Sequence, residues 1–189
     1  MKRPTRLLAI LAVAGVAGVA GYLTRELSRS DTAGVEVPAD AGRALLATRL
    51  PDADGTLQAL EQWRGKVLII NYWATWCPPC MKEIPDFASV ARDFADKPVQ
   101  FVGISIDRVE NVKAFDERID VPYPLLIAPP QALEATARLG NTAQALPFTV
   151  ILDARGEIGH LKLGVLNKSE LEGKIRALLT KNTRSDSAQ

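Results

Sequence analysis

An apolar run in this chain is followed closely by its only two cysteines. Residues 67–73 read Val-Leu-Ile-Ile-Asn-Tyr-Trp, and Cys77 and Cys80 come shortly afterwards, separated by Pro78 and Pro79. The run has the composition of a buried strand. Two prolines suit the first turn of a helix, because the N–H groups of that turn have no partner within the helix. The segment therefore predicts a strand, a turn and a helix, with Cys77 at the helix N-terminus.

This placement of the cysteines favours thiol-disulfide exchange. Residues three apart lie on the same side of a helix, so Cys77 and Cys80 can form or open a disulfide with little backbone movement. The positive end of the helix dipole favours a thiolate at Cys77, and the thiolate is the species that attacks a disulfide. We predict that Cys77 is the nucleophile, that Cys80 is the resolving thiol, and that the reaction needs no cofactor.

Other uses of the cysteine pair are less consistent with the sequence. A structural disulfide would close so short a loop that it would stabilise the fold little. A zinc site needs about four ligands, and His160 is the only histidine of the chain. Two thiolates and one imidazole can hold copper, so a Cu(I)-binding metallochaperone that uses Cys77, Cys80 and His160 remains the alternative function. Strand alternation, however, places His160 with Lys162 on an exposed face.

The N-terminus has the pattern of a membrane anchor. Lys2, Arg3 and Arg6 precede an uncharged apolar stretch at 7–23, which as a helix would span about 26 Å of the roughly 30 Å hydrocarbon layer. Positive flanking charge keeps the N-terminus in the cytoplasm. We expect 1–25 to be a single-pass anchor in the inner (cytoplasmic) membrane, with the domain in the periplasm or another extracytoplasmic space. A cleavable signal segment is the alternative.

The rest of the chain divides into a linker, one domain and a tail. Residues 26–43 are polar and rich in small residues, which predicts a linker. Residues 44–180 suffice for one domain with a substantial core, and 181–189 form a polar tail that we expect to be disordered. The net charge is only +1, with acids and bases interspersed, so the sequence has no footprint for nucleic acid.

Periodicity and turn signals predict an α/β three-layer sandwich. Parallel strands are joined by crossover helices and followed by an antiparallel hairpin and a terminal helix. Pro85 is expected to kink the helix that follows Cys77. The expected strands are 44–50, 57–60, 67–72, 99–106, 148–152 and 158–163, the first two forming a hairpin, and the expected helices begin after Cys77 and at 109, 132 and 168.

Three motifs resemble the TlpA/ResA/CcmG group of membrane-anchored thioredoxin-fold proteins, and TlpA-like disulfide reductases most closely. They are Asn-Tyr-Trp-Ala-Thr-Trp-Cys-Pro-Pro-Cys at 71–80, Glu-Ile-Pro at 83–85 and Leu-Pro-Phe-Thr at 146–149. They occur in the family's order, behind the expected anchor, and the likeness covers roughly 44–179. It implies a thioredoxin-like domain with an N-terminal β-hairpin and a helical insertion at about 108–140.

The same resemblance implies roles for four residues. Cys77 would be the exposed nucleophile and Cys80 its buried partner. Pro147 matches the family's cis-proline beside the active site, where the backbone of Leu146 pairs with an extended substrate segment. Local sequence alone would instead make Pro147 a trans proline at the edge of a strand.

Two further residues belong to the predicted site. Glu83 lies three positions after Cys80 on the same helix, so its carboxylate can approach the dithiol. The resemblance implies that it assists proton transfer to and from the cysteines, and partial burial would raise its pKa towards neutral pH. The alternative is an ordinary solvated glutamate. Trp76 is expected to shield the disulfide and supply contact surface, and Trp73 to lie in the core.

The direction of electron flow and the partners are also predicted. No cation lies between the cysteines to stabilise the thiolate of Cys77, which favours a reductant. The resemblance implies a membrane electron donor of the DsbD/CcdA type, and clients such as apocytochrome c or a copper-oxidase subunit. A peroxiredoxin-like peroxidase would need a threonine three residues before its reactive cysteine, whereas Thr75 lies two before Cys77. A simple binding module gives no reason to place two cysteines at a helix start.

Overall fold

The computed structural model describes residues 37–186. The expected anchor at 1–25 lies outside these residues, as do most of the expected linker and the last residues of the tail. Within the described part of the chain, no helix combines the length and the apolar character needed to cross a membrane.

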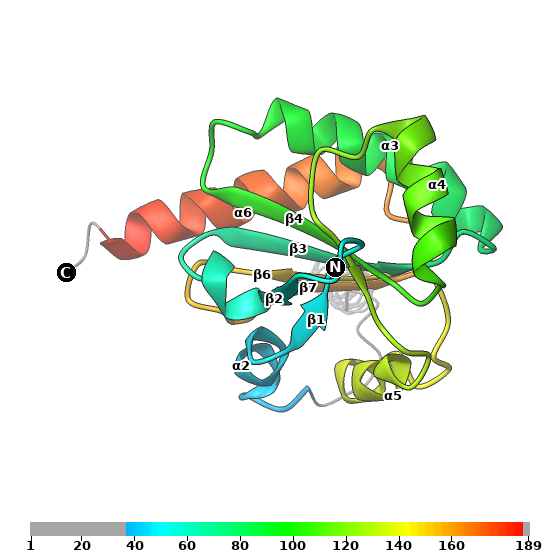
Figure 1. Ribbon diagram of the computed structural model, residues 1–189. Coiled ribbons are helices and arrows are strands. Elements are labelled where there is room, and N and C mark those ends of the chain that lie inside the picture. Colours follow the sequence, from blue (N-terminus) through cyan, green and yellow to red (C-terminus); the bar gives the residue numbers. More distant parts are fainter. Residues whose placement is uncertain (1–36, 187–189) are drawn as a thin grey trace, which may run out of the picture. The chain divides into compact units, whose positions relative to one another are not determined.

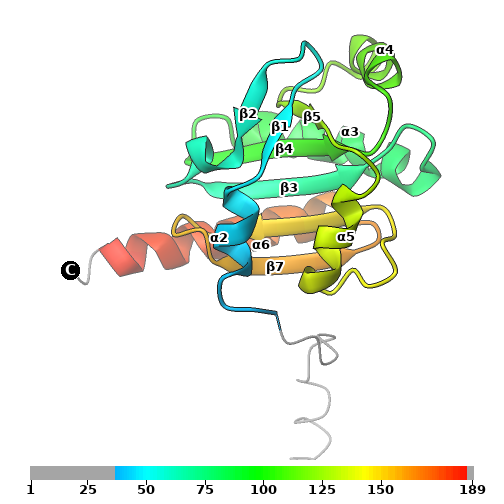
Figure 2. The same cartoon turned by 60° about the horizontal axis from the view of Figure 1, so that its bottom comes forward.

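A five-stranded mixed sheet forms the centre of the domain, in the order β5-β4-β3-β6-β7 (Figures 1 and 2). The first three strands of that order run parallel, and β6 and β7 are antiparallel to their neighbours. Every residue of β3 is buried, as expected for a central strand covered on both faces. The strands are β3 (Val67–Trp73), β4 (Val99–Ser105), β5 (Leu125–Ile127), β6 (Phe148–Leu152) and β7 (Ile158–Leu163).

Helices cover both faces of the sheet and confirm the three-layer prediction (Figures 1 and 2). One face carries α3 (Pro78–Asp93), α4 (Val109–Ile119) and α6 (Lys168–Asp186), and the other carries α2 (Ala41–Leu46) and α5 (Ala132–Thr136). Alternate residues of β3 enter the two apolar clusters between these layers, because successive side chains of a strand point to opposite faces.

The predicted N-terminal hairpin is present but shorter than expected. Strand β1 (Arg49–Pro51) pairs antiparallel with β2 (Leu57–Ala59). The turn between them is closed by Asp52, whose Oδ1 accepts hydrogen bonds from the N–H groups of Asp54 (3.0 Å) and Thr56 (2.9 Å). A short 3₁₀ helix, η1 (Leu60–Trp63), then leads into β3.

The prediction of a strand over 44–50 is wrong in its first half. Residues 41–46 form helix α2 instead, and Ala41, Leu45 and Leu46 are buried against the sheet. Gly42 permits this packing, because a Cβ atom there would lie 2.1 Å from the carbonyl oxygen of Gly156. The helix therefore depends on a contact that is distant in sequence.

The insertion between β4 and β6 contains one strand that the sequence did not predict. The insertion comprises α4, β5, which is the strand that was not predicted, α5 and a short 3₁₀ helix, η2 (Ala137–Leu139). This last helix ends at Gly140, which has a positive φ of 92°.

Other predicted elements agree with the structure. The bounds predicted for β6 and β7 are confirmed, and α3 continues through Pro85 as one helix. Asn167 caps α6 as expected, since its Oδ1 accepts the N–H of Glu170 at 3.0 Å.

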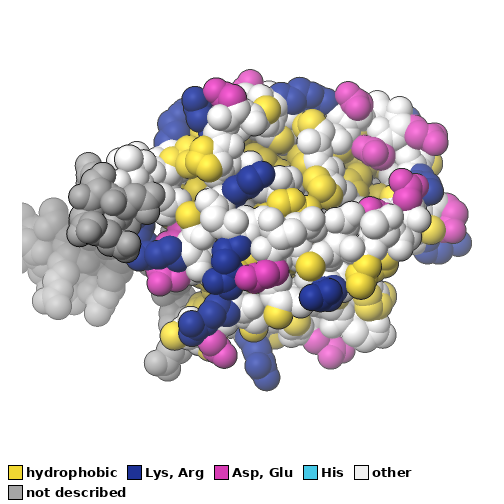
Figure 3. Space-filling view, turned by 60° about the vertical axis from the view of Figure 1, so that its left-hand side comes forward, with side chains coloured by type: hydrophobic (Ala, Val, Ile, Leu, Met, Phe, Trp, Pro, Cys, Tyr) yellow, Lys and Arg dark blue, Asp and Glu magenta, His cyan; other side chains and the backbone are white. Residues whose placement is uncertain are grey.

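Charged side chains of both signs are mixed over the face shown in Figure 3, with apolar side chains visible between them. This mixture agrees with the net charge of +1.

Candidate active site

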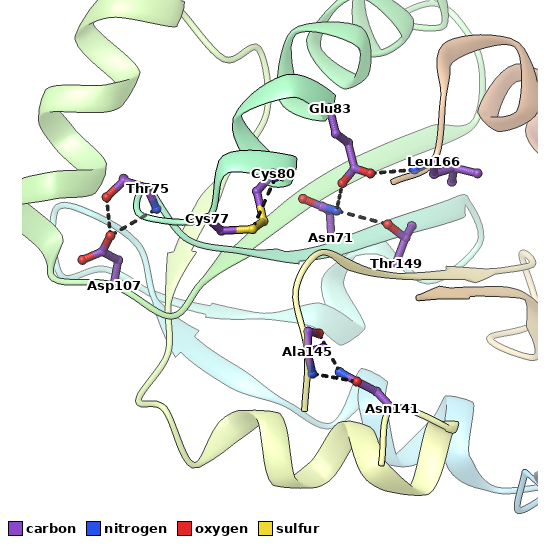
Figure 4. Close-up of a disulfide and its surroundings, with 10 residues drawn as sticks. All are labelled: Asn71, Thr75, Cys77, Cys80, Glu83, Asp107, Asn141, Ala145, Thr149 and Leu166. Carbon is purple, nitrogen blue, oxygen red and sulfur yellow. Dashed lines mark hydrogen bonds between the residues drawn. A yellow bond between two sulfur atoms is a disulfide. The ribbon is translucent and has the colours of Figure 1, made fainter. Parts of the chain in front are cut away.

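The two cysteines form a disulfide at the N-terminus of α3 (Figure 4). Their sulfur atoms are 2.11 Å apart and their Cα atoms 5.3 Å apart. Cys77 has extended backbone geometry and is the N-cap, and its Sγ accepts the N–H of Cys80 at 3.3 Å. The predicted strand, turn and helix are therefore confirmed. A helix-start N–H group aimed at Sγ is the arrangement that stabilises a thiolate.

The disulfide is less accessible than expected. Cys80 is buried, with no exposed surface, and Cys77 is also buried, with only 4% of its surface exposed. The expectation of an exposed Cys77 is thus wrong, because its side chain packs into the apolar cluster that also holds Trp73 and Ala74. The surface beside it is supplied by Trp76, which is 64% exposed.

Glu83 is buried one turn after Cys80 and not solvated. Its Oε1 accepts a hydrogen bond from Asn71 Nδ2 and its Oε2 accepts one from the backbone N–H of Leu166, each at 2.7 Å. Burial raises the pKa of Glu83 to about 7, although these two hydrogen bonds favour the charged form. Both protonation states are therefore accessible near neutral pH.

Asn71 connects Glu83 to the sheet, and sequence reasoning gave it no role. It lies in β3 and is buried, and its Nδ2 also donates to Thr149 Oγ1 of β6 at 3.1 Å. A signal was present in the sequence, since a lone amide inside an apolar strand requires buried hydrogen-bond partners.

Asp107 holds the turn that precedes Cys77 and was also missed. It follows β4, and its Oδ2 accepts hydrogen bonds from the backbone N–H of Thr75 at 3.1 Å and from the Thr75 hydroxyl. Its Oδ1 accepts bonds from the N–H of Arg108 at 2.7 Å and from Asn111 Nδ2 at 2.8 Å. Burial alone would raise the pKa of Asp107, but these bonds outweigh it and the pKa is lowered. The carboxylate thus ties the turn to the start of α4.

The peptide bond between Leu146 and Pro147 is cis, as the resemblance implied. The preceding loop is held by buried Asn141, whose Oδ1 accepts the N–H of Ala145 at 2.9 Å and whose Nδ2 donates to the carbonyl of Ala145 at 3.0 Å (Figure 4). Since the neighbouring Phe148 pairs with Tyr72 near the end of β3, this loop reaches the sheet edge that carries the disulfide.

His160 is half-buried, so its predicted exposure is wrong. Helix α6 packs over it, and Glu170 Oε1 lies 4.0 Å from its Nε2. Burial is the main cause that lowers the pKa of His160, with Lys174 also contributing. His160 pairs with Ile151, and Ile151 pairs with Ile69. Ile69 lies four residues, or about 13 Å along the strand, before the end of β3 that leads to the disulfide. Within residues 37–186 no three His, Cys, Asp or Glu side chains are grouped as metal ligands.

Comparison with known proteins agrees with this geometry. Residues 41–161 match the AhpC/TSA family. The chain is 30% identical over 144 residues to "Thioredoxin-like protein YneN" of Bacillus subtilis, covering 74% of this chain and 81% of that protein. It is 28% identical to "Thiol-disulfide oxidoreductase ResA" of Bacillus cereus, covering 67% and 72% of the two chains.

A solved structure shares the fold. It is a thiol:disulfide interchange protein of the thioredoxin family from Chlorobium tepidum, with a TM-score of 0.64 and 28% identity, covering 70% of this chain and 92% of the other. The family match includes the disulfide, the buried Glu83 and the cis peptide bond at Pro147. The chain therefore belongs to the AhpC/TSA family and is a thioredoxin-like thiol-disulfide oxidoreductase.

Proposed function

We propose that this protein is a reductant of protein disulfides outside the cytoplasm, anchored in the inner membrane by residues 1–25 with its N-terminus in the cytoplasm. The observation that carries this proposal is the pairing of a helix-start disulfide with a buried carboxyl group one turn behind it. The lack of a cation between the cysteines supports the reducing direction.

The reaction consists of two exchange steps. The thiolate of Cys77 attacks a client disulfide, forms a mixed disulfide and releases one client sulfur as a thiolate. Cys80 then loses its proton and attacks Cys77 Sγ, which releases the second client sulfur and leaves the Cys77–Cys80 disulfide. Two electrons pass to the client, and the proton of Cys80 is taken up by the carboxylate of Glu83.

The surface around the disulfide supports binding of an extended client segment. Trp76 lines an apolar groove of about 590 Å³ that also includes Ile106 and Ile127. Leu163 and Val165 are exposed. They lie next to the loop of Pro147, because the N–H of Gly164 between them donates a hydrogen bond to the carbonyl of Pro147 at 2.9 Å. In this proposal Leu146 offers its backbone to the client.

The partners follow from the same reaction. Apocytochrome c or a copper-oxidase subunit is the proposed client. A membrane protein of the DsbD/CcdA type is the proposed electron donor, because a reductant in an oxidising compartment must be resupplied with electrons.

A trapping experiment tests the exchange mechanism. In Cys80→Ser the mixed disulfide cannot be resolved, so the full-length protein is expected to accumulate covalent client adducts that dithiothreitol releases. Cys77→Ser is the matched control and should trap nothing. If Cys80→Ser captures no partner while Cys77 still reacts with an alkylating reagent, the two-step mechanism is wrong.

A redox titration tests the direction. Equilibration of the full-length protein with glutathione at neutral pH should give a midpoint potential well below about −150 mV. A higher value would make the protein an oxidant and would overturn the reducing direction while leaving the exchange chemistry in place.

A further inference from the structure

The amide of Asn71 is only half used in the structure. Its nitrogen donates to Glu83 and to Thr149, but its buried Oδ1 has no hydrogen-bond partner within the described part of the chain. Leaving a buried acceptor unpaired costs about 1 to 3 kcal/mol, so such an atom needs an explanation.

The oxygen lies on the side of the disulfide. In Figure 4 the nitrogen of Asn71 points towards Glu83, and the oxygen points back towards Cys80. Asn71 lies two residues from both Ile69 and Trp73 in β3, so the three side chains share the face of the sheet that packs against Cys80. Cys80 and Glu83 are neighbours on one face of α3, which places the two ends of the amide against consecutive functional groups.

We propose that Asn71 is a positioning residue whose amide oxygen accepts the hydrogen of the Cys80 thiol in the reduced protein, while its amide nitrogen holds the carboxylate of Glu83. This inference rests on the proposed proton transfer between Cys80 and Glu83. It explains the unpaired oxygen, because a disulfide sulfur carries no hydrogen to donate.

The redox cycle supplies the missing donor. When a protein dithiol reduces the disulfide, the Cys77–Cys80 bond breaks, two electrons enter the pair, and the donor leaves as a disulfide. The donor gives up two protons: Cys80 takes up one and becomes a thiol, whose hydrogen then faces Asn71 Oδ1, and the other passes to solvent because Cys77 remains a thiolate. When the protein then reduces a client, the same hydrogen passes as a proton to Glu83. The amide nitrogen of Asn71 keeps Glu83 in place through its hydrogen bond to Oε1.

Infrared spectroscopy of the Cys80 thiol tests this contact directly. In full-length Cys77→Ser protein, Cys80 is the only thiol, so the S–H stretching band belongs to it alone. We expect the band to move to higher frequency when Asn71→Leu is added, because the acceptor is lost. Thr149→Val is the matched control, since it removes the other partner of the Asn71 nitrogen and should leave the band in place. Asn71→Ala, which also lacks a side-chain acceptor, replaces Asn71→Leu if the latter does not fold.

A kinetic measurement separates this inference from the proposed function. Resolution of a mixed disulfide by Cys80 should slow by roughly ten- to a hundredfold in Asn71→Leu, as expected for a misplaced reacting group. An S–H band that is the same with and without Asn71 overturns the inference, even if the wild-type protein reduces insulin. A band that shifts while the wild-type protein fails to reduce insulin would overturn the reductase function and leave the contact standing.

Discussion

At the scale of single residues, the site depends on a carboxyl group removed from water. Glu83 is buried, its oxygens accept two hydrogen bonds within residues 37–186, and its pKa of about 7 lies well above the ordinary value of 4.5. The folded state therefore binds this proton more tightly than the unfolded state does, which links the stability of the fold to pH.

The pH dependence of stability follows from this shift. Because the pKa is raised in the folded state, the contribution of Glu83 is fully present below pH 4.5 and is lost as pH rises through about 7. The free energy of unfolding of the oxidised protein should fall over that window by up to about 3 kcal/mol. In Glu83→Gln this fall should disappear, as measured by urea unfolding at a series of pH values. The exposed Glu110→Gln should keep it, and an unchanged pH profile in Glu83→Gln would refute the assignment.

The same group should govern the rate of the resolving step. With Glu83→Gln the proton acceptor is lost, so release of the client from a mixed disulfide should slow by about a hundredfold at neutral pH. The inflection of that rate near pH 7 should vanish as well. Stopped-flow measurement on a preformed mixed disulfide checks both, and retention of the inflection would mean that another group accepts the proton.

At the scale of elements, the helices and strands that could not be predicted are those that depend on packing between segments distant in sequence. The regular pattern of apolar residues was sufficient for β3, β6, β7 and α3, because each is long enough to show a period or begins with a clear cap. It failed for α2 and β5, which are short and acquire their form from contacts with the sheet.

The contact between α2 and the turn after β6 gives a stability prediction. A Cβ atom at Gly42 would meet a backbone oxygen, so Gly42→Ala should destabilise the protein by about 1 to 3 kcal/mol. Gly173 in α6 is the matched control, since a Cβ atom there meets nothing within 4 Å, and Gly173→Ala should stabilise the protein by about 0.5 to 1 kcal/mol. Thermal unfolding measures both, and equal stability of Gly42→Ala and wild type would contradict the close packing of α2.

The candidate site divides in the same way. The cysteines, Glu83 and Pro147 are recognisable because each lies in a short motif of consecutive residues. Asn71 and Asp107 gain their roles only when β3, β4 and β6 come together, because their partners Thr149 and Thr75 are 78 and 32 residues away. A hydrogen bond across such a distance leaves no periodic signal in the chain.

At the scale of the whole molecule, the described domain is a self-contained unit. Contacts divide the chain between Glu36 and Val37, and both apolar clusters and the disulfide lie within the second part. We expect a chain that lacks residues 1–36 to unfold at the same temperature as the full-length protein and to keep its exchange rate. The proposed anchor further predicts that cell fractionation finds this chain outside the membrane fraction, and a truncated chain that remained in the membrane fraction would contradict that proposal.

The small exposed area of Cys77 shapes the kinetics of the whole protein. With 4% of the residue accessible beside a largely exposed indole, we expect a macromolecular client to contact Trp76 before its disulfide reaches the sulfur. Complex formation therefore precedes bond exchange, and turnover with a protein client should saturate as client concentration rises. Small disulfides that bypass the indole should instead react in proportion to their concentration. The buried sulfur would therefore favour protein clients, which bind before they react, over small disulfides.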